Sequence, residues 1–87
     1  MDKTLQLKIE QKIHESISNK DDIKQLIQSL SNIDNSKSFI LGIVVGRIYN
    51  SFYYQSKRIL NREPTNEEFR EFLELIRSKK SEIENLW

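Results

Sequence analysis

The sequence predicts an all-α fold: a small bundle of about four helices with a long, central third helix. Apolar residues recur at intervals of three and four through most of the chain, as on one face of a helix. Only two glycines and one proline, the residues that most often interrupt helices, occur in 87 residues. Strand-like alternation is confined to "TLQLKIE" at residues 4–10, and the chain offers no second strand to pair with it.

The length predicts a single helical domain over residues 1–87. A domain of this size buries roughly 60–65% of the surface that its unfolded chain exposes, so its stability margin is thin and association with another chain would help. The absence of cysteine excludes disulfides and thiolate sites. Because "MDKTLQLKIEQ" contains no apolar signal region, we expect a cytoplasmic protein.

The first two helices are predicted from apolar spacing and from a capping signal. Residues 4–18 carry an apolar stripe at a strict spacing of four, made of Leu5, Ile9, Ile13 and Ile17. A second helix starts with Asp21 or Asp22 as its N-cap, where a carboxylate accepts hydrogen bonds from free N–H groups, and continues to about residue 32. Its predicted apolar face consists of Ile23, Leu26, Ile27, Leu30 and Ile33.

The third and fourth helices have clear boundaries in the sequence. The third begins at about Ser36, with Asn35 or Ser36 as its cap, and ends near Asn61, because Pro64 cannot continue a helix. Thr65 and Glu68 form a capping box that opens the fourth. The predicted core side of the third helix consists of Leu41, Val45, Ile48, Tyr49, Phe52, Ile59 and Leu60. That of the fourth consists of Phe69, Phe72, Leu73, Ile76, Ile83 and Trp87.

The start of the third helix is apolar on every side over residues 39–46. A membrane span needs about 20 apolar residues, so this segment predicts no membrane insertion; a helix enclosed by its neighbours is expected instead. Gly42 and Gly46 each cost the helix about 0.8–1 kcal/mol relative to alanine, which a closely approaching helix would compensate. That helix either belongs to the same chain or lies across a twofold dimer seam.

The other side of the third helix is basic and polar. Residues 37–62 contain five basic and no acidic side chains, and the residues on this side are Arg47, Ser51, Tyr54, Gln55, Arg58 and Arg62. Arginines can contact phosphates and a tyrosine can stack on an unpaired base, so one interpretation is an anion or nucleic-acid surface. The other is a solvent-exposed face, or one whose arginines pair with Glu67, Glu71 and Glu74 of the fourth helix.

Residue types that carry enzyme chemistry are scarce. His14 is the only histidine and lies away from the apolar stripe, and the acidic Glu67, Glu68, Glu71 and Glu74 have no histidine partner on a second helix. We therefore expect no catalytic residues, metal, cofactor or small-molecule substrate. The sequence predicts a non-enzymatic protein-interaction module, a homodimer or a subunit of a larger assembly. The alternative is a small nucleic-acid-binding regulator that uses the basic face.

Overall fold

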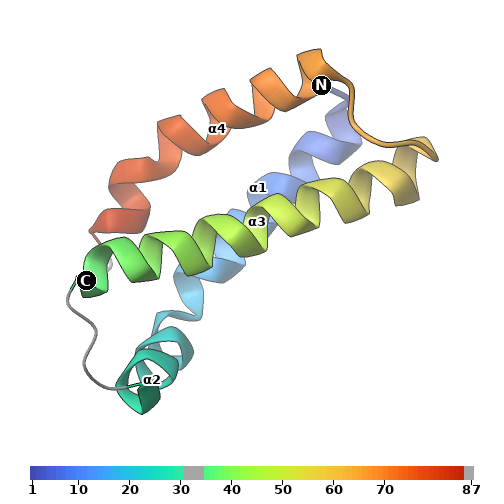
Figure 1. Cartoon of the computed structure of the whole chain (residues 1–87). Coiled ribbons are helices and arrows are strands. Elements are labelled where there is room, and N and C mark those ends of the chain that lie inside the picture. Colours follow the sequence, from blue (N-terminus) through green and yellow to red (C-terminus); the bar gives the residue numbers. More distant parts are fainter. Residues whose placement is uncertain (31–34, 86–87) are drawn as a thin grey trace.

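The computed structural model describes residues 1–30 and 35–85, which form four α-helices. In chain order these are α1 (Lys3–Ser18), α2 (Lys20–Leu30), α3 (Ser36–Leu60) and α4 (Asn66–Glu84). Helix α3 has 25 residues and follows the long axis of a molecule that measures 41 by 21 by 20 Å (Figure 1). The prediction of a small all-α bundle with a long third helix is confirmed.

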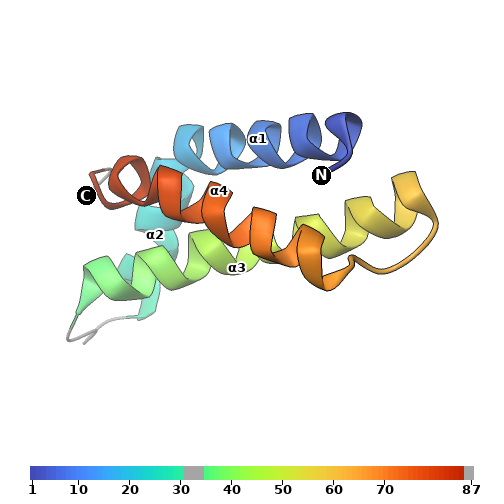
Figure 2. The same ribbon diagram turned by 90° about the horizontal axis from the view of Figure 1, so that it is seen from above.

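Helix α3 is the element against which the others pack. Helices α1 and α4 both run antiparallel to it, whereas the shorter α2 crosses the end at which α3 begins (Figures 1 and 2). Contacts between α1 and α3 are the most extensive in the fold, and those between α2 and α3 are much fewer. One side of α3 is therefore well covered along its length, and its other sides are covered only in part.

Short-range hydrogen bonds define where the helices begin and end. The amide N–H of Ser38 donates to the Asn35 side chain at 3.0 Å, so Asn35 is the cap of α3. Thr65 and Glu68 form both hydrogen bonds of the capping box at the start of α4. Helix α3 ends at Leu60, and its C-cap Asn61 adopts the left-handed conformation (φ 58°) that asparagine tolerates better than most residues.

The core lies mainly between α1 and α3, with α4 closing one side. Phe52 of α3 and Phe72 of α4 stack at its centre, with ring centroids 4.4 Å apart and an interplanar angle of 7°. The buried apolar side chains are Leu5, Ile9, Ile13, Ile23, Ile40, Val44, Ile48, Phe52, Phe72 and Ile83. The predicted stripe of the first helix is thus confirmed, with Ile17 packed half-buried at its end.

The structure corrects two predictions about α2. The helix begins at Lys20, one residue after α1's C-cap Asn19, so Asp21 and Asp22 lie inside its first turn and do not cap it. Of its predicted apolar face, Ile23 is buried and Ile27 half-buried, while Leu26 and Leu30 remain about half exposed. The short α2 reaches only the end of α3, which leaves part of its face uncovered; Ile33 lies outside the described residues.

Residues 39–46 are not enclosed, contrary to the prediction. Within this segment only Ile40 and Val44 are buried, and Phe39 is 38% exposed. A side-chain carbon added at Gly42 or Gly46 would meet no atom of a described neighbour within 4 Å, so no part of residues 1–30 and 35–85 packs closely on either glycine. The reason is that α1 covers one side of α3 while α4 covers only the adjacent one (Figure 2).

Two serines in the core lead to a prediction about stability. The side chains of Ser16 and Ser56 are fully buried, and neither hydroxyl has a hydrogen-bond partner in the described part of the chain. Burying an unpaired hydroxyl costs about 1–3 kcal/mol by protein mutational data, and alanine also favours a helix. We expect Ser56→Ala to raise the free energy of unfolding by about 1 kcal/mol, measured by urea denaturation.

The matched control for this prediction is Ser51→Ala on the same helix. Ser51 is only half-buried, so its replacement brings the gain in helix propensity without removing a buried, unpaired hydroxyl. The gain from Ser56→Ala should exceed that from Ser51→Ala. Equal effects, or a destabilised Ser56→Ala protein, would contradict the interpretation.

Candidate functional site

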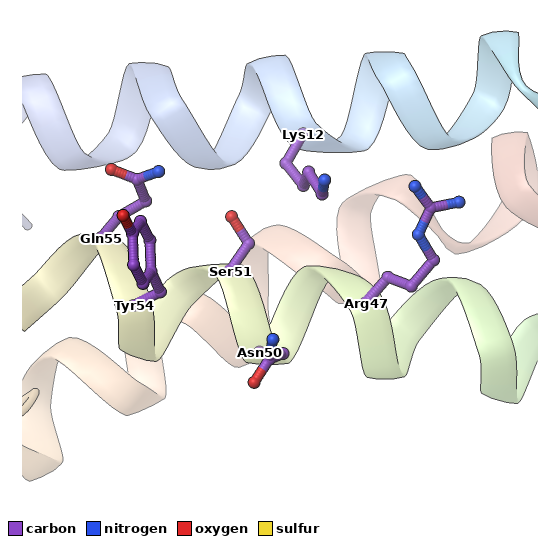
Figure 3. A pocket seen from close by; sticks show the side chains of 6 residues that line it. All are labelled: Lys12, Arg47, Asn50, Ser51, Tyr54 and Gln55. Atoms are coloured by element: carbon purple, nitrogen blue, oxygen red, sulfur yellow. The ribbon is translucent and has the colours of Figure 1, made fainter.

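The structure separates the predicted basic face into two parts. Arg47, Ser51 and Gln55 point from α3 toward α1, and Tyr54 stands at the edge of the same space (Figure 3). Arg58 joins this group by donating from its Nε to Gln55 Oε1 at 2.9 Å. Arg62 lies beyond the end of α3 and does not belong to it. Five of the six predicted residues therefore stay together, and the sixth has another role.

Arg62 stabilises the start of α4. Its guanidinium donates to both carboxylate oxygens of Glu68, at 2.7 and 3.3 Å, and also to the backbone carbonyl of Glu63 at 3.0 Å. The same carboxylate accepts the backbone N–H of Thr65 at 2.9 Å. The guanidinium, and next the Thr65 N–H, lower the pKa of Glu68 from 4.5 to about 2. The predicted pairing of an arginine with the acidic helix is thus found, with Glu68 as the partner instead of Glu67, Glu71 or Glu74.

A polar groove lies between α1 and α3. It has a volume of about 330 Å³ and is lined by Lys12, Arg47, Asn50, Ser51, Tyr54 and Gln55 (Figure 3). A neighbouring hollow of about 240 Å³ shares Lys12, Ser51 and Gln55 and adds Lys8, Gln11 and Glu15 from α1. We call the two together the α1–α3 groove. Helix α1 contributes Lys8 and Lys12 to this groove, and α3 contributes Arg47.

The charges in the α1–α3 groove are mostly positive. Among the described residues that line the groove, only Glu15 carries a carboxylate. Its Oε2 lies 3.8 Å from Lys12 Nζ. The side chains of Lys8 and Arg47 form no ion pair or hydrogen bond with any residue in the ranges 1–30 and 35–85. The groove therefore holds cationic groups that the described chain does not neutralise.

Sequence reasoning missed the contribution of α1 to this groove. Lys8 and Lys12 stand one turn apart beside the apolar stripe of the first helix, and that spacing places them on one edge of it. Which neighbour this edge faces depends on the packing of α1 against α3, which local spacing does not specify. Asn50 also lines the groove wall, although its side chain points away from α1 in Figure 3.

An exposed apolar surface surrounds the two glycines. Tyr49 and Leu73 are each 42% exposed, and Phe39 is nearly as exposed one turn before Gly42. We call this surface the glycine face; its members are Phe39, Gly42, Val45, Gly46 and Tyr49 of α3 and Leu73 of α4. It continues into a pocket of about 280 Å³ lined by Leu41, Val45, Leu73, Ile76, Arg77, Lys80 and Ile83. The glycine face is uncharged, and the only charged residues of the described ranges that line the adjoining pocket are Arg77 and Lys80.

The acidic side chains at the start of α4 have separate structural roles. Glu68 binds Arg62, and the carboxylate of Glu71 contacts the α-amino group of Met1. In residues 1–30 and 35–85 the structure brings no three His, Cys, Asp or Glu side chains together as a metal-binding group. His14 is exposed on α1.

None of the helices in the described ranges combines the length and the apolar character needed to cross a membrane. No protein-family model, curated protein or solved structure matches this chain.

Proposed function

We propose that the protein is a non-enzymatic protein-interaction module that forms a homodimer through the glycine face. The observation that carries this proposal is that Gly42 and Gly46 lie inside α3 with no described residue packed against them. Each costs that helix about 0.8–1 kcal/mol relative to alanine, and no described part of the chain packs on them in return. A second chain that approaches closely there supplies the missing compensation.

The composition of the glycine face fits contact with an identical face. In a twofold dimer the same patch of both chains meets, so a charged side chain close to the axis would lie next to its own copy. The glycine face carries no charged side chain, the exposed residues Ser38 and Asn50 beside it are polar but neutral, and the cations Arg77 and Lys80 line the adjoining pocket. Close approach of the two α3 backbones at the glycines would let Phe39, Tyr49 and Leu73 of each chain pack against the other.

The dimer is tested with Gly46→Glu, measured by sedimentation equilibrium between about 1 μM and several hundred micromolar. Because the space beside Gly46 is open, the fold tolerates the new side chain, whereas across a twofold axis the two carboxylates repel each other. We expect the wild-type protein to dimerise and the variant to dissociate at least tenfold more readily, equivalent to about 1.4 kcal/mol. Circular dichroism checks that the variant remains helical.

The matched control is Gln25→Glu, which makes the same change of charge at an exposed position of α2. It should leave the dissociation constant unchanged. A wild-type protein that stays monomeric throughout this range, or a dimer that Gly46→Glu does not weaken, contradicts the proposal.

A further inference from the structure

We propose that the α1–α3 groove binds the sugar-phosphate backbone of a single-stranded nucleic acid. This site lies on a different side of α3 from the glycine face and does not depend on dimer formation. The first observation is the convergence of cations from two helices: Lys8 and Lys12 from α1, and Arg47 from α3. Lys8 and Lys12 are one helical turn, about 6 Å, apart along the groove.

Unneutralised charge is the second observation. Arg47 is half-buried, yet no carboxylate within residues 1–30 and 35–85 pairs with it, and Lys8 is likewise unpaired there. The one acidic side chain in the groove, Glu15, lies nearest to Lys12. A row of cations facing a common groove attracts a polyanion, because binding releases the counterions that the polyanion had condensed.

The neutral side chains of the groove suit a nucleotide strand. Ser51 and Gln55 line the groove beside Lys12 and offer hydrogen bonds to phosphate or sugar oxygens. Tyr54 stands at the groove's edge and is 62% exposed, so its ring is free to stack on an unpaired base (Figure 3). Arg58 is positioned by its hydrogen bond to Gln55 and extends the basic surface beyond it.

The arrangement favours a single strand over a duplex. The major groove of B-DNA is about 12 Å wide and admits one α-helix. Here α1 lies directly alongside the basic side of α3, and two packed helices have axes about 8–10 Å apart, which makes the pair too wide to enter that groove. A flexible strand with unpaired bases can instead lie in the groove between the helices.

The experiment measures fluorescence anisotropy of a labelled 12-nucleotide oligothymidine between 25 and 200 mM NaCl. With three phosphate contacts, the logarithm of the binding constant should fall with the logarithm of salt concentration with a slope of about −2. Lys12→Ala and Arg47→Ala should each reduce that slope by about 0.7. Tyr54→Ala should weaken binding about five-fold or more without changing the slope.

Lys20→Ala is the matched control, because it removes one positive charge from an exposed position of α2. It should leave both affinity and salt slope unchanged. Absence of binding at 25 mM NaCl with about 100 μM protein overturns the proposal, as does an equal loss with Lys20→Ala. The proposal is also overturned if the matching duplex binds more tightly than the single strand. It is overturned as well if inorganic polyphosphate binds with the same affinity as the oligonucleotide and Tyr54→Ala has no effect.

Discussion

Phe52→Ala is expected to lower the free energy of unfolding by about 3–5 kcal/mol, the largest effect of any single substitution considered for this protein. Phe52 is fully buried and stacks on Phe72, so its removal leaves a cavity at the point where α3 and α4 meet. A chain of 87 residues has a total stability of roughly 4–13 kcal/mol, so the variant retains little of it. Urea denaturation followed by circular dichroism measures the change.

Two further variants keep this prediction testable if Phe52→Ala does not fold. Phe52→Leu fills much of the cavity and should cost less, whereas Tyr54→Ala, on the same helix but exposed, should change stability by no more than about 0.5 kcal/mol. In a double-mutant cycle with Phe72→Leu, the two rings should show a coupling energy of about 0.5–1.5 kcal/mol. A loss from Phe52→Leu no larger than that from Tyr54→Ala would show that the stack is not central to the core.

Glu68→Ala is expected to lower the free energy of unfolding by about 2–3 kcal/mol. The substitution removes half of the capping box of α4 and also the carboxylate that Arg62 contacts with two hydrogen bonds. Glu68 is 9% exposed, so little water replaces these contacts, although the guanidinium itself is half exposed and adds only a modest share. Thr65→Ala disrupts the cap alone and should cost about 1 kcal/mol.

The lowered pKa of Glu68 predicts how the free energy of unfolding depends on pH in the acidic range. The folded-state pKa of Glu68 is about 2, below the ordinary value of 4.5, mainly because the Arg62 guanidinium donates hydrogen bonds to the ionised form. A group with a lowered pKa stabilises the fold fully above its unfolded pKa and loses this contribution as pH falls through the folded value. The contribution of Glu68 should therefore disappear progressively between about pH 4.5 and pH 2.

Glu68→Gln isolates this effect, because a glutamine side chain can still complete a capping box but carries no charge. Above pH 5 the difference in unfolding free energy between the wild-type and Glu68→Gln proteins should be constant. It should shrink from about pH 4.5 downward, while other carboxylates titrate alike in both proteins. A difference that does not vary with pH down to 2.5 would contradict the assigned pairing.

Most helix boundaries follow from the sequence. The cap at Asn35, the capping box of Thr65 and Glu68, and the break before Pro64 all lie where the residue types predicted them. Each depends on hydrogen bonds or steric limits that act within about four residues. The exception is α2, for which two neighbouring aspartates offered equivalent caps and the helix began before both.

The candidate surfaces could be predicted only in part. Arg47, Ser51, Tyr54 and Gln55 share one side of a helix, and that alignment is a property of helical spacing. Lys8 and Lys12 reach the same groove only because α1 packs alongside this part of α3. Arg62 has the residue type of the basic face, but the turn after Asn61 directs it to Glu68 instead.

The sequence by itself determined an all-α chain, the positions of its caps and which residues share each helix face, because these depend on contacts between near neighbours. Only the tertiary structure decided which faces are covered. Apolar residues on every side of residues 39–46 indicated enclosure, yet no residue of the described ranges covers Gly42 or Gly46, because α1 and α4 occupy other sides of α3. Coverage depends on how segments distant in the chain pack together, and periodicity within one helix carries no information about that.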